Sequence, residues 1–201
     1  MSKTFRDPRD GKRYRICKIG DQVWMAENLA YDGLAQNNGK LLDITAKPLG
    51  TYYLNEPMYG KLYGRLYTWE EAMIAAPPGW HLPTKEEWDE LSEFIELDRI
   101  VKSDKDLSGK ALKSEIGWNP YSGIENLDIY GFSALPGGNG NSDGSFLNVG
   151  NSGYWWSANE YYSSLAYSRN MGYNDDDAYW SYDSKSILQS VRCVQDCGEA
   201  K

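Results

Sequence analysis

Apolar residues recur at helical spacing in a segment around residue 70. Trp69, Ala72, Met73 and Ala76 fall on one face of a helix with about 3.6 residues per turn. Thr68 stands at the expected N-cap, and two glutamates follow within the first turn. A Pro-Pro-Gly sequence comes directly afterwards and predicts the end of this helix.

A second helix is predicted immediately downstream. Thr84 and Glu87 have the spacing of a capping box, in which each side chain accepts a hydrogen bond from the other residue's backbone N–H. An apolar stripe then continues at helical spacing through Trp88, Leu91, Phe94 and Ile95. Acidic residues occupy the other face, so one side of this helix is expected to pack against a core. A third, charged helical segment is expected over residues 99–108.

Strand patterns stand at both ends of the chain. The runs YRICKIG and QVWMAENL flank Gly20-Asp21, which predicts a hairpin. Further strands are expected over residues 153–159 and about 187–195, and residues 32–60 are rich in turn formers. Together the elements predict one α+β domain over residues 1–201, with two helices, small antiparallel sheets and long irregular loops.

Charge and composition exclude several functional classes. The net charge is −8 and the pI is about 4.7, and no basic stripe of the kind that binds nucleic acid is present. No apolar run is long enough to span a membrane, and no signal peptide is recognisable. We therefore expect neither a nucleic-acid partner nor a membrane span.

Candidate catalytic and metal-binding residues are few. His81 is the only histidine, and its aromatic and proline neighbours favour a structural role over a catalytic one. Cys17, Cys193 and Cys197 provide neither a disulfide framework nor a zinc set, and Cys193 is expected to point into the core. The acidic run at 175–177 resembles a solvated hairpin tip more than a calcium loop. We expect no enzymatic activity, no cofactor and no metal.

Residues 159–184 have an unusually narrow composition. Of these 26 residues, 18 are Asn, Tyr, Ser or Asp. Antibody paratopes favour a similar set, because Tyr gives a large contact area with few rotatable bonds and small polar residues adapt their hydrogen bonds. The same residues also fill ordinary solvent-facing strands and turns. Composition alone leaves both interpretations open.

Six motifs, in order, resemble the Fibrobacter succinogenes major paralogous domain. They are VWMAENL (23–29), YGRLYTWEEAM (63–73), PPGWHLPTKEEWDEL (77–91), GFSALPGG (131–138), DGSFLNVGNSGYWWSANE (143–160) and KSILQSVRCV (185–194). The likeness runs over about residues 7–196. It implies a C-type lectin-like fold, in the variant shared with formylglycine-generating enzymes.

The resemblance also extends to the variable proteins of diversity-generating retroelements, which show massive sequence variation. Those systems mutate adenines in a C-terminal variable region, and changes to an AAC codon yield Tyr, Ser, Asp and other residues, but never a stop. This implies a variable region at about 155–194, in which Trp155, Trp156, Lys185, Ser186 and residues 190–194 are fixed scaffold.

The leading hypothesis is a non-enzymatic receptor or display protein that binds a protein or glycan ligand. The expected ligand-binding residues are Tyr161, Tyr162, Ser163, Ser164, Tyr167, Ser168, Asn170, Tyr173, Asn174, Asp175, Asp176, Asp177, Tyr179, Trp180, Ser181 and Asp183.

Two further hypotheses remain. The first is a carbohydrate-binding module without calcium dependence, since Asn55-Glu56-Pro57 and Trp118-Asn119-Pro120 do not match the EPN, QPD or WND triplets of calcium-dependent lectins. The second, least favoured, is an oxidase like the formylglycine-generating enzymes, with Cys193 and Cys197 as its cysteine pair.

Overall fold

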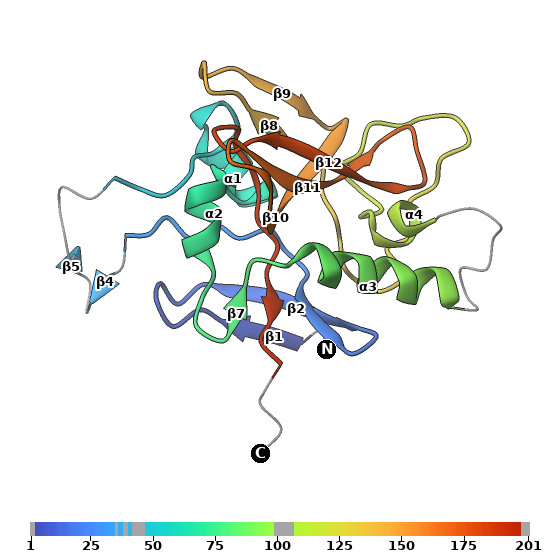
Figure 1. Cartoon of the computed structure of the whole chain (residues 1–201), viewed down its shortest axis with the longest axis horizontal. Coiled ribbons are helices and arrows are strands. Elements are labelled where there is room, and N and C mark those ends of the chain that lie inside the picture. Colours follow the sequence, from blue (N-terminus) through green and yellow to red (C-terminus); the bar gives the residue numbers. More distant parts are fainter. Residues whose placement is uncertain (1–2, 35, 38–39, 42–46, 99–106, 198–201) are drawn as a thin grey trace.

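The computed structural model describes residues 3–34, 36–37, 40–41, 47–98 and 107–197, and strands dominate it (Figure 1). A five-stranded sheet has the order β1-β2-β3-β14-β7. A seven-stranded sheet follows the path β12-β11-β10-β13-β6, and β8 and β9 join it through β10. The strands of the first sheet are β1 (Lys3–Arg6), β2 (Arg13–Ile19), β3 (Gln22–Met25), β7 (Trp80–His81) and β14 (Val194–Gln195). Those of the second are β6 (Leu66–Tyr67), β8 (Gly137–Gly140), β9 (Phe146–Val149), β10 (Ser152–Tyr162), β11 (Leu165–Gly172), β12 (Ala178–Ser184) and β13 (Gln189–Ser190).

The helices are short. They are the 3₁₀ turn η1 (Tyr53–Asn55), α1 (Pro57–Tyr63), α2 (Trp69–Ala75), α3 (Lys85–Leu97) and α4 (Ser108–Leu112). A two-stranded ribbon pairs β4 (Gln36–Asn37) with β5 (Lys40–Leu41).

The predicted α+β class, with two helices and small antiparallel sheets in a C-type lectin-like arrangement, is wrong. The protein is mainly β. The sequence did not predict this because several strands of both sheets have only two residues. Such strands are too short to leave an alternating pattern in the sequence.

Both predicted helices are confirmed, and so is the capping box predicted for the second helix; the first helix has a capping box that was not predicted. Thr68 caps α2 with Glu71, and Thr84 caps α3 with Glu87. In the second box the Glu87 carboxylate accepts a hydrogen bond of 2.8 Å from the Thr84 backbone N–H. The helix expected over 99–108 falls mostly outside the described residues, and α1 lies where only turns were expected.

The strand predictions had mixed outcomes. The hairpin of β2 and β3 is confirmed, with Ile19 opposite Gln22. The single strand expected over about 187–195 is wrong, because this segment contributes β13 to one sheet and β14 to the other. Between them, Val191, Arg192 and Cys193 are buried. In Figure 1 this red segment descends from the upper sheet to the lower one. The apolar run therefore marks a buried crossing rather than one strand.

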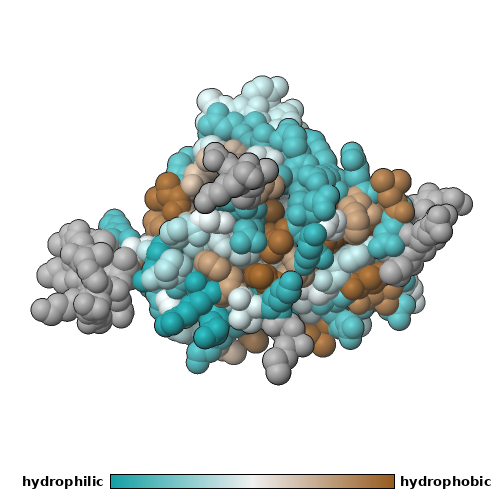
Figure 2. All heavy atoms as spheres, turned by 90° about the horizontal axis from the view of Figure 1, so that it is seen from below, coloured by the Kyte–Doolittle hydropathy of each residue, from teal (hydrophilic) through white to brown (hydrophobic). Residues whose placement is uncertain are grey.

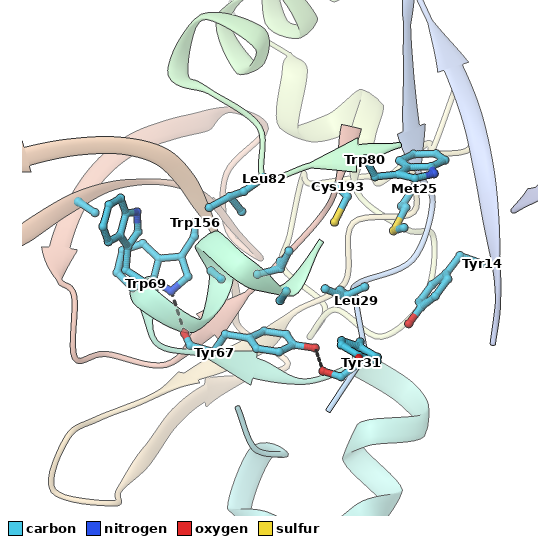
Figure 3. Close-up of a cluster of buried hydrophobic side chains, with 14 residues drawn as sticks. Tyr14, Met25, Leu29, Tyr31, Tyr67, Trp69, Trp80, Leu82, Trp156 and Cys193 are labelled. Carbon is cyan, nitrogen blue, oxygen red and sulfur yellow. Dashed lines mark hydrogen bonds between the residues drawn. The ribbon is translucent and has the colours of Figure 1, made fainter. Parts of the chain in front are cut away.

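Two apolar clusters hold β10 from opposite sides. Trp156 belongs to the cluster shown in Figure 3, where its indole N–H donates to the Tyr67 carbonyl at 2.8 Å. In the same cluster the Tyr67 hydroxyl donates to the Tyr31 carbonyl at 2.7 Å. Trp155 belongs to the second cluster, and its indole N–H donates to Asn28 at 2.9 Å. Since consecutive residues of a strand point to opposite faces, these two tryptophans fix β10 between both cores.

The surface seen from below is mainly hydrophilic. Apolar side chains form separate patches on it rather than one continuous area (Figure 2). None of the helices described here is long and apolar enough to cross a membrane.

Candidate functional site

The expected ligand-binding residues lie on three consecutive antiparallel strands, β10, β11 and β12, and on the two turns that connect them. Their register places Trp155 opposite Arg169, and Arg169 opposite Trp180. Directly opposed residues share one face of a sheet. This face, which we call the α3 face, turns toward helix α3, since Arg169 Nη2 donates to Ser92 Oγ of that helix at 2.7 Å. The opposite face carries Ser168 and its partners.

The far end of β10 is irregular. Its register with β11 shifts between Trp156 and Glu160, and again between Glu160 and Tyr162. In a regular strand, adjacent side chains point to opposite faces. Here the rings of Tyr161 and Tyr162 lie 4.4 Å apart, centroid to centroid. Bulges re-aim side chains in this way, and they are common beside functional sites.

Five aromatic side chains gather at this end of the sheet. Tyr161 stacks on Tyr182 with centroids 4.2 Å apart and planes 16° apart. The Tyr161 ring also meets Tyr167 edge-on at 5.2 Å, and Tyr167 meets Trp180 edge-on at 5.8 Å. We call this set the aromatic cluster; its members are Tyr161, Tyr162, Tyr167, Trp180 and Tyr182.

The aromatic cluster is open to solvent at one end and fixed at the other. Tyr162 is 64% exposed and Tyr182 is 54% exposed. Trp180 is half-buried, and its indole N–H donates to Asp89 of α3 at 2.7 Å. Lys85 Nζ lies 4.9 Å from the Trp180 ring centroid. The cluster therefore offers exposed aromatic area on a support that is held in place.

The Tyr161 hydroxyl has a raised pKa. A hydrogen bond with Tyr162 raises the pKa of the Tyr161 hydroxyl above its ordinary value near 10, and the Tyr162 charge adds to this effect. The Tyr161 phenol stays neutral, so it can both donate and accept hydrogen bonds.

A second group of expected residues lies in the loop between β11 and β12, at the other end of these strands. The Tyr179 hydroxyl lies 2.9 Å from both the Asp175 and the Asp177 carboxylates. The hydrogen bond to Asp175 is the main cause that raises the Tyr179 pKa. The Asp175 backbone carbonyl accepts a hydrogen bond from the buried Lys113 side chain, and Lys110 N–H donates to the Asp176 carbonyl at 2.7 Å. This acidic turn is thus bound to α4, as well as forming the expected tip.

A third group contributes to the interior. Ser168 is buried, and its hydroxyl donates to Asp183 at 2.8 Å. Gln189 of β13 donates to the same carboxylate oxygen at 2.8 Å. These contacts join three strands, so Ser168 and Asp183 already have partners within the protein.

The other expected residues are scattered around these groups. Ser163 and Ser164 form the exposed turn between β10 and β11. Asn170 and Ser181 are half-buried on the face opposite α3, and Tyr173 packs edge-on against Tyr121. Asn174 is exposed beside the acidic turn. The sixteen residues therefore do not form one surface.

Three residues of the site escaped the sequence prediction. Tyr182 is central to the aromatic cluster, and alternation with Trp180 along β12 could have indicated it. Lys85 and Asp89 belong to α3 and approach Trp180 through tertiary packing. The sequence carried no signal for that contact.

The residues with metal-binding or nucleophilic chemistry lie elsewhere. His81 bonds Asp196 and Glu87, Cys193 is buried in the core, and Cys17, Cys193 and Cys197 are free thiols. Burial raises the pKa of Cys193 to about 12, which makes a poor nucleophile. Within the described ranges, no group of three or more His, Cys, Asp or Glu side chains is arranged to hold a metal ion.

Fold and site together define a mainly β protein with an aromatic surface on a three-stranded antiparallel meander. A family model, the Fibrobacter succinogenes major domain, matches residues 17–195. The chain therefore belongs to the Fibrobacter succinogenes major domain family. No curated protein and no solved structure matches the chain.

Proposed function

We propose that this chain is a non-enzymatic ligand-binding protein whose binding surface is the aromatic cluster. The observation that carries the proposal is the stacking of Tyr161 on Tyr182 beside the 64%-exposed Tyr162. Exposed Tyr and Trp side chains give large, stiff contact areas and are frequent binding hot spots. The protein places these rings on a surface, whereas Trp155 and Trp156 of the same strand serve the core.

We further propose that the chain is the variable protein of a diversity-generating retroelement. The arrangement of β10–β12 supports this proposal, because the four tyrosines of the aromatic cluster belong to neither apolar core, whereas Trp180 packs against one of them. Side chains of the cluster can change without loss of the Trp155 and Trp156 anchors. The acidic turn and the buried Ser168 and Asp183 would tolerate fewer substitutions, which restricts the diversified surface to part of 159–184.

The first experiment is to sequence the DNA around the gene. The expected result is a nearby near-copy of codons 155–194, with mismatches almost only at adenines of the copy, and a reverse transcriptase gene close to it. Absence of both would overturn the retroelement proposal. It would leave the aromatic cluster as a binding surface of fixed sequence.

A second candidate function is glycan binding by stacking. It is favoured by the exposure of Tyr162 and Tyr182, since aromatic faces are the contacts that sugar rings would use without a metal. A glycan array probed with and without a chelator tests it. Binding that persists in chelator and disappears on Tyr182→Ala supports this candidate, and binding lost in chelator contradicts it.

A further inference from the structure

Strand β12 forms an open edge of the seven-stranded sheet. Its only neighbour among the described strands is β11. An edge strand presents alternate N–H and C=O groups that can pair with another chain. At about 3.4 Å per residue, the seven residues Ala178–Ser184 offer roughly 24 Å of edge.

This edge lacks the protection that exposed edges usually carry. Charged residues, prolines, bulges or very short strands normally prevent unwanted pairing. Strand β1, the edge of the other sheet, includes Lys3 and Arg6. In contrast, β12 has the sequence AYWSYDS and pairs with β11 without a bulge. Its one charged residue, Asp183, accepts hydrogen bonds from Ser168 and Gln189. An edge of this length without protection is suited to pairing.

A groove of about 460 Å³ separates β12 from α3 and adjoins this edge. Its charged side chains are three carboxylates and one guanidinium. Asp89 already pairs with Lys85 at 2.6 Å, and Arg169 is buried under the groove floor. Glu93 is exposed to solvent. The groove thus has an acidic wall on α3 and an apolar floor from β12, lined by Asp89, Ser92, Glu93, Glu96, Arg169, Ala178, Tyr179 and Trp180.

We propose that the β12 edge binds an extended segment of a partner protein, with a Lys or Arg at every second position, as an added strand. Alternate side chains of such a strand would point to the α3 face, toward Glu93. The backbone pairing supplies affinity, and the acidic wall selects the basic side chains. The inference does not depend on the proposed function, because it uses the β12 backbone and an α3 carboxylate rather than the stacked rings of Tyr161 and Tyr182.

The test uses a fluorescent seven-residue peptide that alternates Thr and Lys, measured by anisotropy at low salt. Two further peptides carry N-methyl groups, one at every Lys amide and the other at every Thr amide. All residues whose side chains share one face of a strand also direct their N–H groups to one edge. Exactly one methylated peptide should therefore bind like the parent, while the other loses binding.

Charge reversal on α3 tests the acidic wall. Glu93→Lys should weaken peptide binding about tenfold, because a like charge then faces the basic side chains. Glu90→Lys is the matched control, since it makes the same charge change on the same helix outside the groove, and it should retain affinity. The double variant Tyr161→Ala/Tyr182→Ala should also bind the peptide normally. That result separates this site from the proposed ligand surface.

Three outcomes would overturn the proposal. Equal binding of both N-methylated peptides would show that the backbone is not used, and absence of binding by the parent peptide would show that the edge takes no basic strand. A concentration-dependent dimer in analytical ultracentrifugation that the peptide fails to dissociate would assign the edge to a second copy of the chain.

Discussion

Tyr161 and Tyr182 stack nearly parallel, with ring centroids 4.2 Å apart, although they come from β10 and β12, which are not neighbours in the sheet. The intervening β11 places Tyr167 directly opposite Tyr182. The irregular end of β10 brings Tyr161 over this pair. The contact therefore depends on the bulge as well as on sheet order.

Removing this stack should affect binding much more than folding. We expect Tyr161→Ala/Tyr182→Ala to leave the melting temperature nearly unchanged, because both rings lie on the surface, and to abolish binding of any ligand that the glycan array or a protein screen identifies. Trp156→Ala is the control in the same strand. It removes a fully buried side chain and should cost about 3–5 kcal/mol of unfolding free energy. A large loss of stability in the tyrosine variant would show that the cluster is structural.

The sequence predicted the local features of this protein well. N-cap residues and apolar stripes predicted α2 and α3, because those signals lie within a few residues of one another. The β2–β3 hairpin was equally local. The sheets were not predictable in the same way. A strand such as β13 has two residues, and its pairing of Ser190 with Trp155 depends on contacts distant in sequence.

The candidate site likewise combines features that the sequence indicated with contacts that it did not. The composition of 159–184 singled out Tyr161, Tyr162, Tyr167 and Trp180, which the structure brings together, and their role in ligand binding stays a prediction. It could not separate surface residues from interior ones, because Ser and Asp serve both. Ser168 is polar and fully buried, and only the Asp183 and Gln189 contacts explain its position.

Ser168→Ala tests whether that polar group is structural. The substitution removes a buried hydrogen bond to Asp183 and should lower the unfolding free energy by roughly 1–3 kcal/mol. Ser164→Ala, in the exposed turn, is the matched control and should change it by less than about 0.5 kcal/mol. Urea denaturation measures both. Equal stability of the two variants would contradict a structural role and return Ser168 to the ligand-binding set.

Arg192 makes a different set of buried hydrogen bonds, and substitutions of Arg192 should lower the unfolding free energy strongly. The side chain is fully buried, and Nη2 donates to Asn28 Oδ1 at 2.7 Å. Further hydrogen bonds reach the carbonyls of Met25, Phe132 and Ser133. Burial lowers the pKa of Arg192 to about 10, so the guanidinium stays charged at neutral pH.

Replacing Arg192 by Leu removes the guanidinium donor from these carbonyls and leaves Asn28 Oδ1 with the Trp155 indole N–H as its donor. It should lower the unfolding free energy by about 3–5 kcal/mol. Lysine should not restore stability, because it lacks the planar fork that reaches several acceptors. Arg13→Leu on the exposed part of β2 controls for loss of one positive charge, and it should change stability by about 0.5 kcal/mol or less. Wild-type stability of Arg192→Lys would contradict this account.

His81 should make folding stability depend on pH. Its Nδ1 lies 2.6 Å from Asp196 and its Nε2 lies 2.7 Å from Glu87. Burial alone would lower the His81 pKa, but the hydrogen bonds and charges of these two carboxylates outweigh it, so the pKa is raised above 6.5. The folded state therefore binds the proton more tightly than the unfolded chain does. The stabilisation is fully present below about pH 6.5 and is lost as the pH rises through the folded-state pKa.

The measurement is urea denaturation of the wild type and His81→Gln from pH 5 to pH 9. The difference in unfolding free energy should be largest at the acidic end and should shrink with rising pH. Asp196→Asn removes one of the two carboxylates without disturbing the Glu87 cap of α3, so it should shift the transition to lower pH. A difference that stays constant over the whole range would mean that His81 acts through packing alone.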